Sequence, residues 1–272
     1  MSQKHSELPE IEFALAALSA LGAVYFVAAY LVLPTIWKHY EHQKQLEPLS
    51  ALTRTAQGIP GDPINIGLIG NQQDVVCALH YAGWYPADPI TFRTSLAIVG
   101  SVLLNRPYPD APISPLYYRG EKQLLAFEKP DSKSADRRHH LRLWQVLESG
   151  DEGRPVWLGA TTFDRSVGFS RYTGAVTHHI APNTDLEREQ LTEDLNSARL
   201  VDAIYQISGI GPSLTRHNGE GDLYFTDGDI WISRLVKGCE KREAPAIALA
   251  NPPIVAFKNL VWKGATFLAP TD

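Results

Sequence analysis

Residues 137–144 read RRHHLRLW, an alternation of charged and apolar side chains that predicts a β-strand with two unlike faces. Successive side chains of a strand point to opposite sides of its sheet. Leu141 and Leu143 therefore mark the side that faces the core, and His139 lies with them. The other side carries Arg138, His140, Arg142 and Trp144. We expect a row of cationic side chains on the face turned away from the core.

Other segments with a strand-like pattern lie on both sides of this stretch. The predicted strands are 64–69, 113–118, 123–128, 138–147, 155–163 and 176–180. Two more, at 223–225 and 230–236, flank Asp227 and Gly228, a dipeptide typical of a tight hairpin. Short segments separated by turn residues indicate a mostly antiparallel sheet.

Helical periodicity occurs at 72–84, 89–104 and 185–199, and the last of these can be capped by Asn183 or Thr184. The apolar tail at 252–270 is interrupted by charges and glycine, which predicts an edge strand or a segment lying on the domain or on a membrane surface. The predicted fold class is α+β, with one N-terminal transmembrane helix followed by a mostly antiparallel sheet domain with flanking helices.

An uncharged run, FALAALSALGAVYFVAAYLVL, occupies residues 13–33. As a helix it would be about 31 Å long, at about 1.5 Å per residue, which matches a hydrocarbon core of about 30 Å. A cleaved signal peptide fits less well, because the residues before the run are acidic. We therefore expect a membrane anchor with a juxtamembrane helix at 1–45, a linker at 46–62 and a soluble domain at 63–272.

The basic residues near this run predict its orientation. Only Lys4 precedes the run, whereas Lys38, Lys44 and Arg54 follow it. Positively charged residues are enriched on the cytoplasmic side of a membrane span. This distribution places the soluble domain in the cytoplasm.

Composition excludes several classes of protein. The formal net charge of -5 and the pI near 6.0 argue against a nucleic-acid partner, which usually requires a strongly basic surface. Cys77 and Cys239 are the only cysteines, and they stand far apart outside any CxxC spacing. They predict neither a zinc knuckle nor a disulfide framework, and they leave a single disulfide open.

A second histidine pair lies in AVTHHI at 175–180. Alternation places His178 with apolar neighbours and His179 with Thr177 on the polar face, so we expect His140 and His179 to share a site. The following PNTDLERE begins a helix, whose first backbone N–H groups can receive an anion. The expected ligand-binding residues are Arg138, His140, Arg142, His179 and Arg188.

Three kinds of chemistry could use these residues. Guanidinium groups bind phosphates or carboxylates bidentately, which predicts anion recognition. A metal site would use His140, His179 and Asp185, with Glu187 as a substitute carboxylate, a set suited to zinc or iron. A single histidine oriented by a carboxylate would instead serve as a general acid or base.

A structural role is the alternative to all three. The arginines could pair with acidic residues in a network, with Glu128, Asp136, Asp185 and Glu187 as candidates. No HExxH, P-loop, GxSxG or GxGxxG motif occurs in the sequence. The residues therefore do not decide whether the protein is an enzyme, and no cofactor is expected unless a divalent metal binds.

Six motifs occur in an order that resembles the LssY carboxy-terminal domain family: PINIGLIG, AGWYPAD, SPLYYRG, RRHHLRLW, RPVWLGATTFD and THHIAPNTDLERE. The resemblance covers about residues 63–200. It implies a bacterial, membrane-bound setting close to lipid-phosphate chemistry, because family members occur as extensions of membrane proteins with DedA-like or phosphatidic-acid-phosphatase-type domains. This chain lacks such a multi-span portion, and the resemblance brings no catalytic residues.

The leading functional hypothesis is a single-pass protein of the bacterial inner membrane that binds an anionic, phosphate-bearing ligand, including a lipid headgroup. The runner-up is a metal-dependent or histidine-based hydrolase of lipid-linked phosphoesters. The third is a structural subunit of an envelope or secretion complex. The expected partners are the lipid bilayer and proteins of such a complex.

Overall fold

The computed structural model describes residues 7–27, 51–56, 58–87, 114–131, 137–169, 176–208, 215–218 and 220–266. Two compact units are present, Met1–Glu41 and His42–Asp272. The predicted helix at 89–104 lies outside the described residues.

The first unit contains helix α1, Glu7–Val27. Its side chains from residue 12 to residue 24 are exposed. In the described part of the chain, no helix combines the length and the apolar character needed to cross a membrane. Residues 28–33 of the predicted span lie outside the described residues, and the span stays a prediction.

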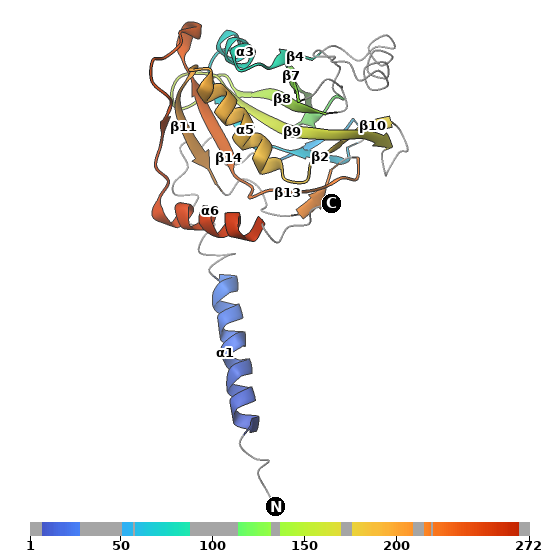
Figure 1. Ribbon diagram of the computed structural model, residues 1–272, viewed down its shortest axis with the longest axis vertical. Helices are drawn as coiled ribbons and strands as arrows, with labels where there is room; N and C mark the ends of the chain where they lie inside the picture. Colours follow the sequence, from blue (N-terminus) through green and yellow to red (C-terminus); the bar gives the residue numbers. More distant parts are fainter. Residues whose placement is uncertain are drawn as a thin grey trace, which may run out of the picture. The chain divides into compact units, whose positions relative to one another are not determined.

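The second unit is an α+β domain built on a nine-stranded, mostly antiparallel sheet (Figure 1). Its order is β15-β11-β14-β3-β9-β8-β7-β4, with β10 paired to β9. The bounds are β3 Ile66–Ile69, β4 Tyr85–Pro86, β7 Leu125–Pro130, β8 Arg138–Leu147, β9 Val156–Phe169, β10 Val176–Ile180, β11 Val201–Ile207, β14 Ile230–Leu235 and β15 Ile247–Ala248. Only the β14–β3 and β11–β15 pairs of this sheet are parallel among the described strands.

Helices cover one face of this sheet. These are α3, Gln72–Tyr81, and α5, Thr184–Ser197, which lies over β9 and β14 (Figure 1). Their apolar side chains form one buried cluster with Leu141, Leu143 and Trp157 of the sheet. Asn183 caps α5 by accepting a hydrogen bond from the Asp185 N–H, as the sequence predicted. The burial of Leu141 and Leu143 in this cluster confirms them as core residues.

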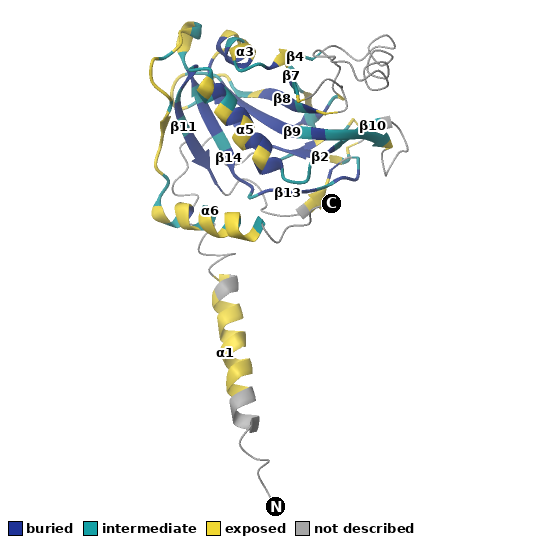
Figure 2. Cartoon of the chain, viewed as in Figure 1, coloured by how far each residue is buried: buried dark blue, intermediate teal, exposed yellow. Residues whose placement is uncertain are grey.

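A second sheet, of four strands, packs against the other face of the nine-stranded sheet. Its order is β2-β1-β5-β6, with β1 Leu52–Arg54, β2 Pro60–Pro63, β5 Tyr117–Tyr118 and β6 Glu121–Lys122. Leu116 and Tyr118 pack with Trp144, Val156 and Leu158 in a second apolar cluster. The face of β8 that was expected to point away from the core is therefore also buried, as the dark central strands of Figure 2 show.

Three local predictions differ from the structure. The expected linker at 46–62 contains β1 and the start of β2, which are joined by a 2.8 Å hydrogen bond from the Thr53 hydroxyl to the Asp62 carbonyl. The tail forms a helix, α6 Pro253–Ala265, so the edge strand was wrong, whereas the alternative of a segment lying on the domain agrees with the contacts of this helix. The hairpin around Asp227 does not form, because β13, Leu223–Phe225, pairs with β12, Thr215–His217, while β14 pairs with β11 and β3. The Asp227 N–H donates to Asp185 of α5, so contacts with the helix shape this turn.

A disulfide joins Cys77 of α3 to Cys239 of the 3-10 helix η3, Lys237–Cys239. The two residues are separated by 162 positions in the sequence, and their Cα atoms are 6.0 Å apart. This is the disulfide that the spacing of the cysteines left open.

Candidate functional site

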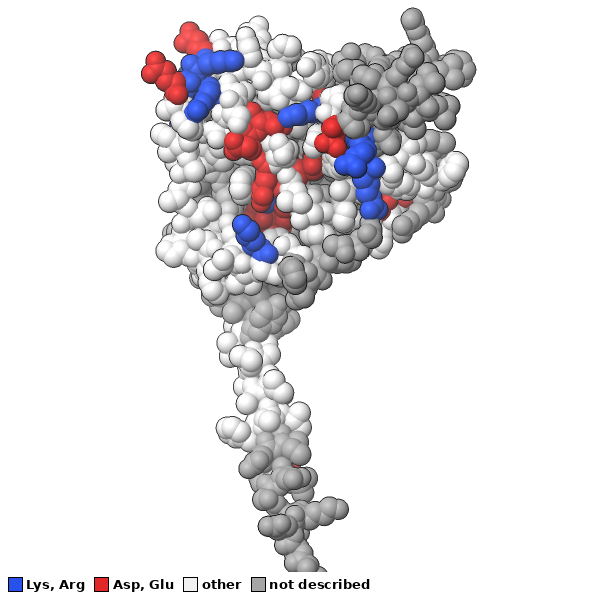
Figure 3. All heavy atoms as spheres, in the orientation of Figure 1, with Lys and Arg blue, Asp and Glu red and all other residues white. Residues whose placement is uncertain are grey.

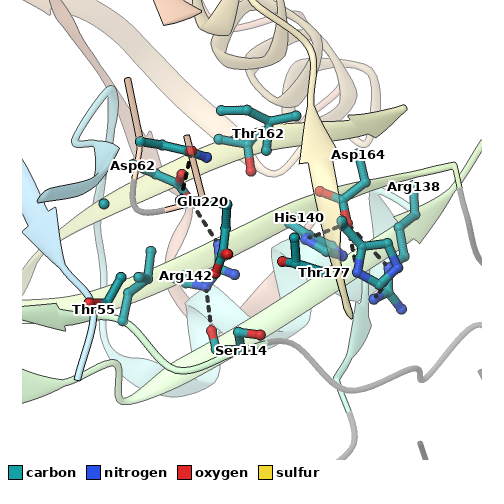
Figure 4. A pocket seen from close by; sticks show the side chains of 15 residues that line it. Thr55, Asp62, Ser114, Arg138, His140, Arg142, Thr162, Asp164, Thr177 and Glu220 are labelled. Carbon is teal, nitrogen blue, oxygen red and sulfur yellow. Dashed lines mark hydrogen bonds and ion pairs between the residues drawn. The ribbon is translucent and has the colours of Figure 1, made fainter. Parts of the chain in front are cut away.

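A small polar pocket lies between the two sheets, where β8, β9 and β10 meet β2. Its volume is about 60 Å³. A buried water needs about 10 to 15 Å³, so the pocket has room for a small group and not for a whole lipid. Arg138, His140 and Asp164 lie together on one side, and Arg142 lies with Asp62 and Ser114 on the other (Figure 4).

Each arginine of the pocket is buried against a carboxylate. The Arg138 Nη1 atom is 2.8 Å from Glu128 Oε2, and its Nε is 3.8 Å from Asp164 Oδ2. The Arg142 Nη1 atom donates to Asp62 Oδ2 at 3.0 Å, and its Nε donates to the Ser114 carbonyl at 3.1 Å. These carboxylates offset the cationic row predicted for β8.

His140 and Asp164 form a buried pair in which burial shifts the pKa of both groups. His140 Nδ1 is 3.3 Å from Asp164 Oδ2. Burial, together with the charges of Arg138 and Arg142, lowers the pKa of His140 well below its usual value. Burial raises the pKa of Asp164 to about 8, against the opposing effect of Arg138. At neutral pH the imidazole is therefore neutral and the carboxyl is mostly protonated.

Buried polar atoms of this pocket lack hydrogen-bond partners among the described residues. They are His140 Nε2, Thr162 Oγ1 and Asp164 Oδ2. Such atoms are rare in folded proteins, because each loses its bonds to water without replacement. All three belong to side chains that line one cavity, so a small hydrogen-bonding group placed there, such as a water, would satisfy them.

The sequence pattern that defines the LssY C-terminus family matches residues 43–230, more than half of the chain. The chain belongs to the LssY C-terminus family. Comparison with curated proteins and with solved structures found no match. The matched range confirms the resemblance noted in the motifs. It includes every strand that lines the pocket, so the site is part of the LssY C-terminus domain, whereas α6 lies after the match.

The LssY C-terminus domain uses His178, and not His179, at the pocket. The His178 and His140 ring centroids are 6.0 Å apart, and the His178 Nε2 atom is 3.5 Å from Arg138 Nη2. Alternation put Thr177 and His179 on one face and His178 and Ile180 on the other, but Thr177, His178 and Ile180 all line the pocket, so the apolar side chain of Ile180 did not mark the core. A β-bulge between His179 and Ile180 further disturbs the period of two.

His179 does not line the pocket. Its Nδ1 atom is 2.7 Å from Asp222 Oδ1, and its ring occupies the space that a side chain at Gly168 would need. Gly168 stands on the neighbouring strand β9, opposite Thr177. The glycine thus permits the close approach of the imidazole to the β9 backbone.

Arg188 and Asp185 belong to a separate cluster at the start of α5. Arg188 binds Asp227 through two bonds of 2.6 and 3.0 Å, and its guanidinium lies 5.0 Å from the ring centre of Trp231. Asp185 accepts hydrogen bonds from Thr226 at 2.6 Å and from the Trp262 indole at 3.1 Å. Neither residue lines the pocket of His140.

The metal set proposed from the sequence is not assembled, because Asp185 lies in the Arg188 cluster and His179 binds Asp222. The substitute ligand, Glu187, is 2.7 Å from His139 Nδ1. No group of three or more metal-ligating side chains occurs in the part of the LssY C-terminus domain that the structure describes.

Sequence reasoning missed Thr162 and Asp164 of the LssY C-terminus domain. The segment ATTFD at 160–164 carried the signal, since Thr162 and Asp164 alternate along a strand and therefore share one face. Asp62 offered no comparable signal, because it lies in the segment expected to be a linker.

Stability should depend on pH through Asp164. Its pKa of about 8 in the folded domain exceeds the ordinary 3.8, so the folded state holds a proton that the unfolded state has released between these values. The stabilisation by this proton is complete below about pH 4 and is lost as the pH rises through about 8. Asp164→Asn should therefore become progressively more stable relative to wild type from pH 5 to pH 8.5. Urea unfolding at both pH values measures this, and a constant difference between the two proteins contradicts it. Asp131→Asn, at an exposed side chain, is the control.

Proposed function

We propose that this LssY C-terminus domain binds a small anionic group, a phosphate or a carboxylate, in the pocket between Arg138 and Arg142. The observation that carries the proposal is a pair of buried polar atoms without hydrogen bonds among the described residues, His140 Nε2 and Thr162 Oγ1, whose side chains line the same cavity as both arginines. An anion supplies acceptors to all of them. Hydrogen bonds of this charge-assisted kind are roughly twice as strong as neutral ones.

Protonation supports the same proposal. With Asp164 protonated, the carboxylates of Glu128 and Asp62 balance the two arginines, so the pocket has no excess negative charge that would repel an anion. A bound anion also favours the protonated form of Asp164. Affinity for phosphate should therefore fall as the pH rises through the pKa of this group.

Inorganic phosphate should protect the domain against thermal unfolding, and Thr162→Val should abolish the protection. A ligand at 100 times its Kd stabilises the folded state by about 2.7 kcal/mol. Arg142→Ala should also abolish it, but that variant leaves Asp62 buried without its partner, so the valine variant is the sharper test. The measurement is the Tm with phosphate and with chloride at equal ionic strength.

The matched control is Ser233→Ala. It removes another buried hydroxyl without a partner in the described residues, on β14 and away from the lining of the pocket. This variant should keep the full phosphate effect. A wild-type Tm that is identical in phosphate and chloride would overturn anion binding and leave the structural role of the network.

A second candidate function is hydrolysis of a phosphoester by acid–base catalysis. It is favoured by the neutral His140 and the protonated Asp164, which lie 3.3 Å apart. The imidazole could take a proton from the attacking water, and the carboxyl could give one to the oxygen of the leaving group. Release of phosphate from a lipid phosphomonoester, lost in Asp164→Asn while phosphate binding persists, would distinguish catalysis from binding.

The apolar run at 13–33 supplies the third part of the proposal, a membrane anchor for the domain. Its support is the absence of charge over a length that matches a bilayer. Full-length protein that stays with the membrane after alkaline carbonate washing agrees with an anchor, and protein released by the wash contradicts it.

A further inference from the structure

Helix α6, Pro253–Ala265, carries its apolar side chains on the side that faces away from the domain. Phe257 is 65% exposed, Leu260 69% and Val261 54%. Together with three smaller exposed residues they recur at the three- and four-residue spacing of one helix face. This outer stripe consists of Pro253, Ala256, Phe257, Leu260, Val261 and Gly264. Figure 2 shows α6 largely in the colour of exposed residues.

The opposite face of α6 uses polar groups to bind the domain. Lys258 pairs with the buried Asp229, Asn259 exchanges hydrogen bonds with Gln206, and the Trp262 indole donates to Asp185 at 3.1 Å. Val255 is the buried apolar residue of this face. A helix at a water surface normally has the reverse arrangement, with apolar residues inward and polar residues outward. The outer stripe of α6 is therefore suited to an apolar environment.

We propose that the outer stripe of α6 lies on the surface of an anionic lipid bilayer. The helix contains no acidic residue, and of its two lysines Lys258 pairs with Asp229 of the domain while Lys263 is exposed. An apolar face with an exposed basic side chain at its border, here Lys263, is typical of helices that lie in the headgroup region of a membrane. Figure 3 shows the surface along α6 as mostly white, whereas charged side chains gather over α5.

The apolar run at 13–33 precedes the domain in the chain, which favours a bilayer over other apolar partners for α6. This part of the inference depends on the proposed membrane anchor. Residues 34–50 connect the run to the first described residue of the domain, Ala51. Even fully extended, seventeen residues span only about 60 Å at about 3.5 Å per residue. An anchored domain thus stays close to lipid, and the short connection raises the effective concentration of the membrane at α6.

A fluorescent label on the stripe tests the proposal in full-length protein. Because the two native cysteines form a disulfide, Leu260→Cys introduces a thiol that can be labelled with a nitrobenzoxadiazole dye without reductant. The matched control is Leu124→Cys, since Leu124 is 58% exposed and lies outside α6. In vesicles of phosphatidylcholine and phosphatidylglycerol, the dye at 260 should emit at shorter wavelength and be quenched several-fold less by iodide than the dye at 124.

The quenching experiment and the alkaline carbonate wash together test bilayer contact by α6 separately from the membrane anchor. Equal quenching at 260 and 124, in protein that alkaline carbonate does not release, overturns bilayer contact by α6 and leaves the anchor intact. A protected dye at 260, in protein that carbonate releases, supports α6 and contradicts the anchor. Protection that requires no vesicles and grows with protein concentration identifies a second copy of the chain as the occupant and overturns the proposal.

Discussion

Replacing Arg188 with methionine is expected to destabilise the domain by about 3 to 5 kcal/mol, the usual cost of removing one partner from a buried ion pair. The Arg188 side chain is only 2% exposed, and it holds Asp227 and Asp185 together at the start of α5. It also donates to the Asp229 carbonyl at 3.0 Å. Without the guanidinium, the two carboxylates repel each other in a site where water cannot screen them. Urea unfolding at neutral pH measures the loss.

Two further variants test this explanation. Arg234→Met removes an ion pair with Asp202 in which both side chains are about one third exposed, and such pairs contribute at most about 1 kcal/mol. Adding Asp227→Asn to Arg188→Met should restore part of the stability, because the uncompensated charge is the main cost. Similar losses in Arg188→Met and Arg234→Met would contradict this account.

Loss of the Cys77–Cys239 disulfide should also cost about 5 kcal/mol, because it closes a long loop and restricts the unfolded chain. The bond links α3 to η3 across 162 positions of sequence. The double variant with serine at both positions should unfold at lower urea concentration than wild type. Dithiothreitol should lower the wild-type midpoint to the same value and leave the double variant unchanged. A wild-type midpoint that does not respond to reduction contradicts this expectation.

Local patterns predicted the elements that contain the site. The strands Arg138–Leu147 and Val176–Ile180 have the predicted bounds, because each alternates over several residues and ends at turn residues. The capping of α5 by Asn183 was likewise readable, since the cap and the first turn are adjacent in the chain. Signals of this kind depend only on neighbours in sequence.

The surroundings of each strand could not be predicted in this way. Whether the charged face of β8 meets water or a second sheet depends on residues far away, such as Asp62, which is 80 positions from Arg142. For the same reason, alternation assigned His179 to the pocket, whereas the structure places His178 there. An isoleucine looks the same in sequence whether it faces the core or lines a cavity.

The covalent link between α3 and η3 has a consequence for where the protein matures. Cytosolic thiols are kept reduced by glutathione and thioredoxin, whereas disulfides persist in the bacterial periplasm. The cross-link therefore stabilises the domain in an oxidising compartment and not in a reducing one. Material produced in a reducing host cytosol would then carry two free thiols and lose the stabilisation of the cross-link, and export to an oxidising compartment would restore it.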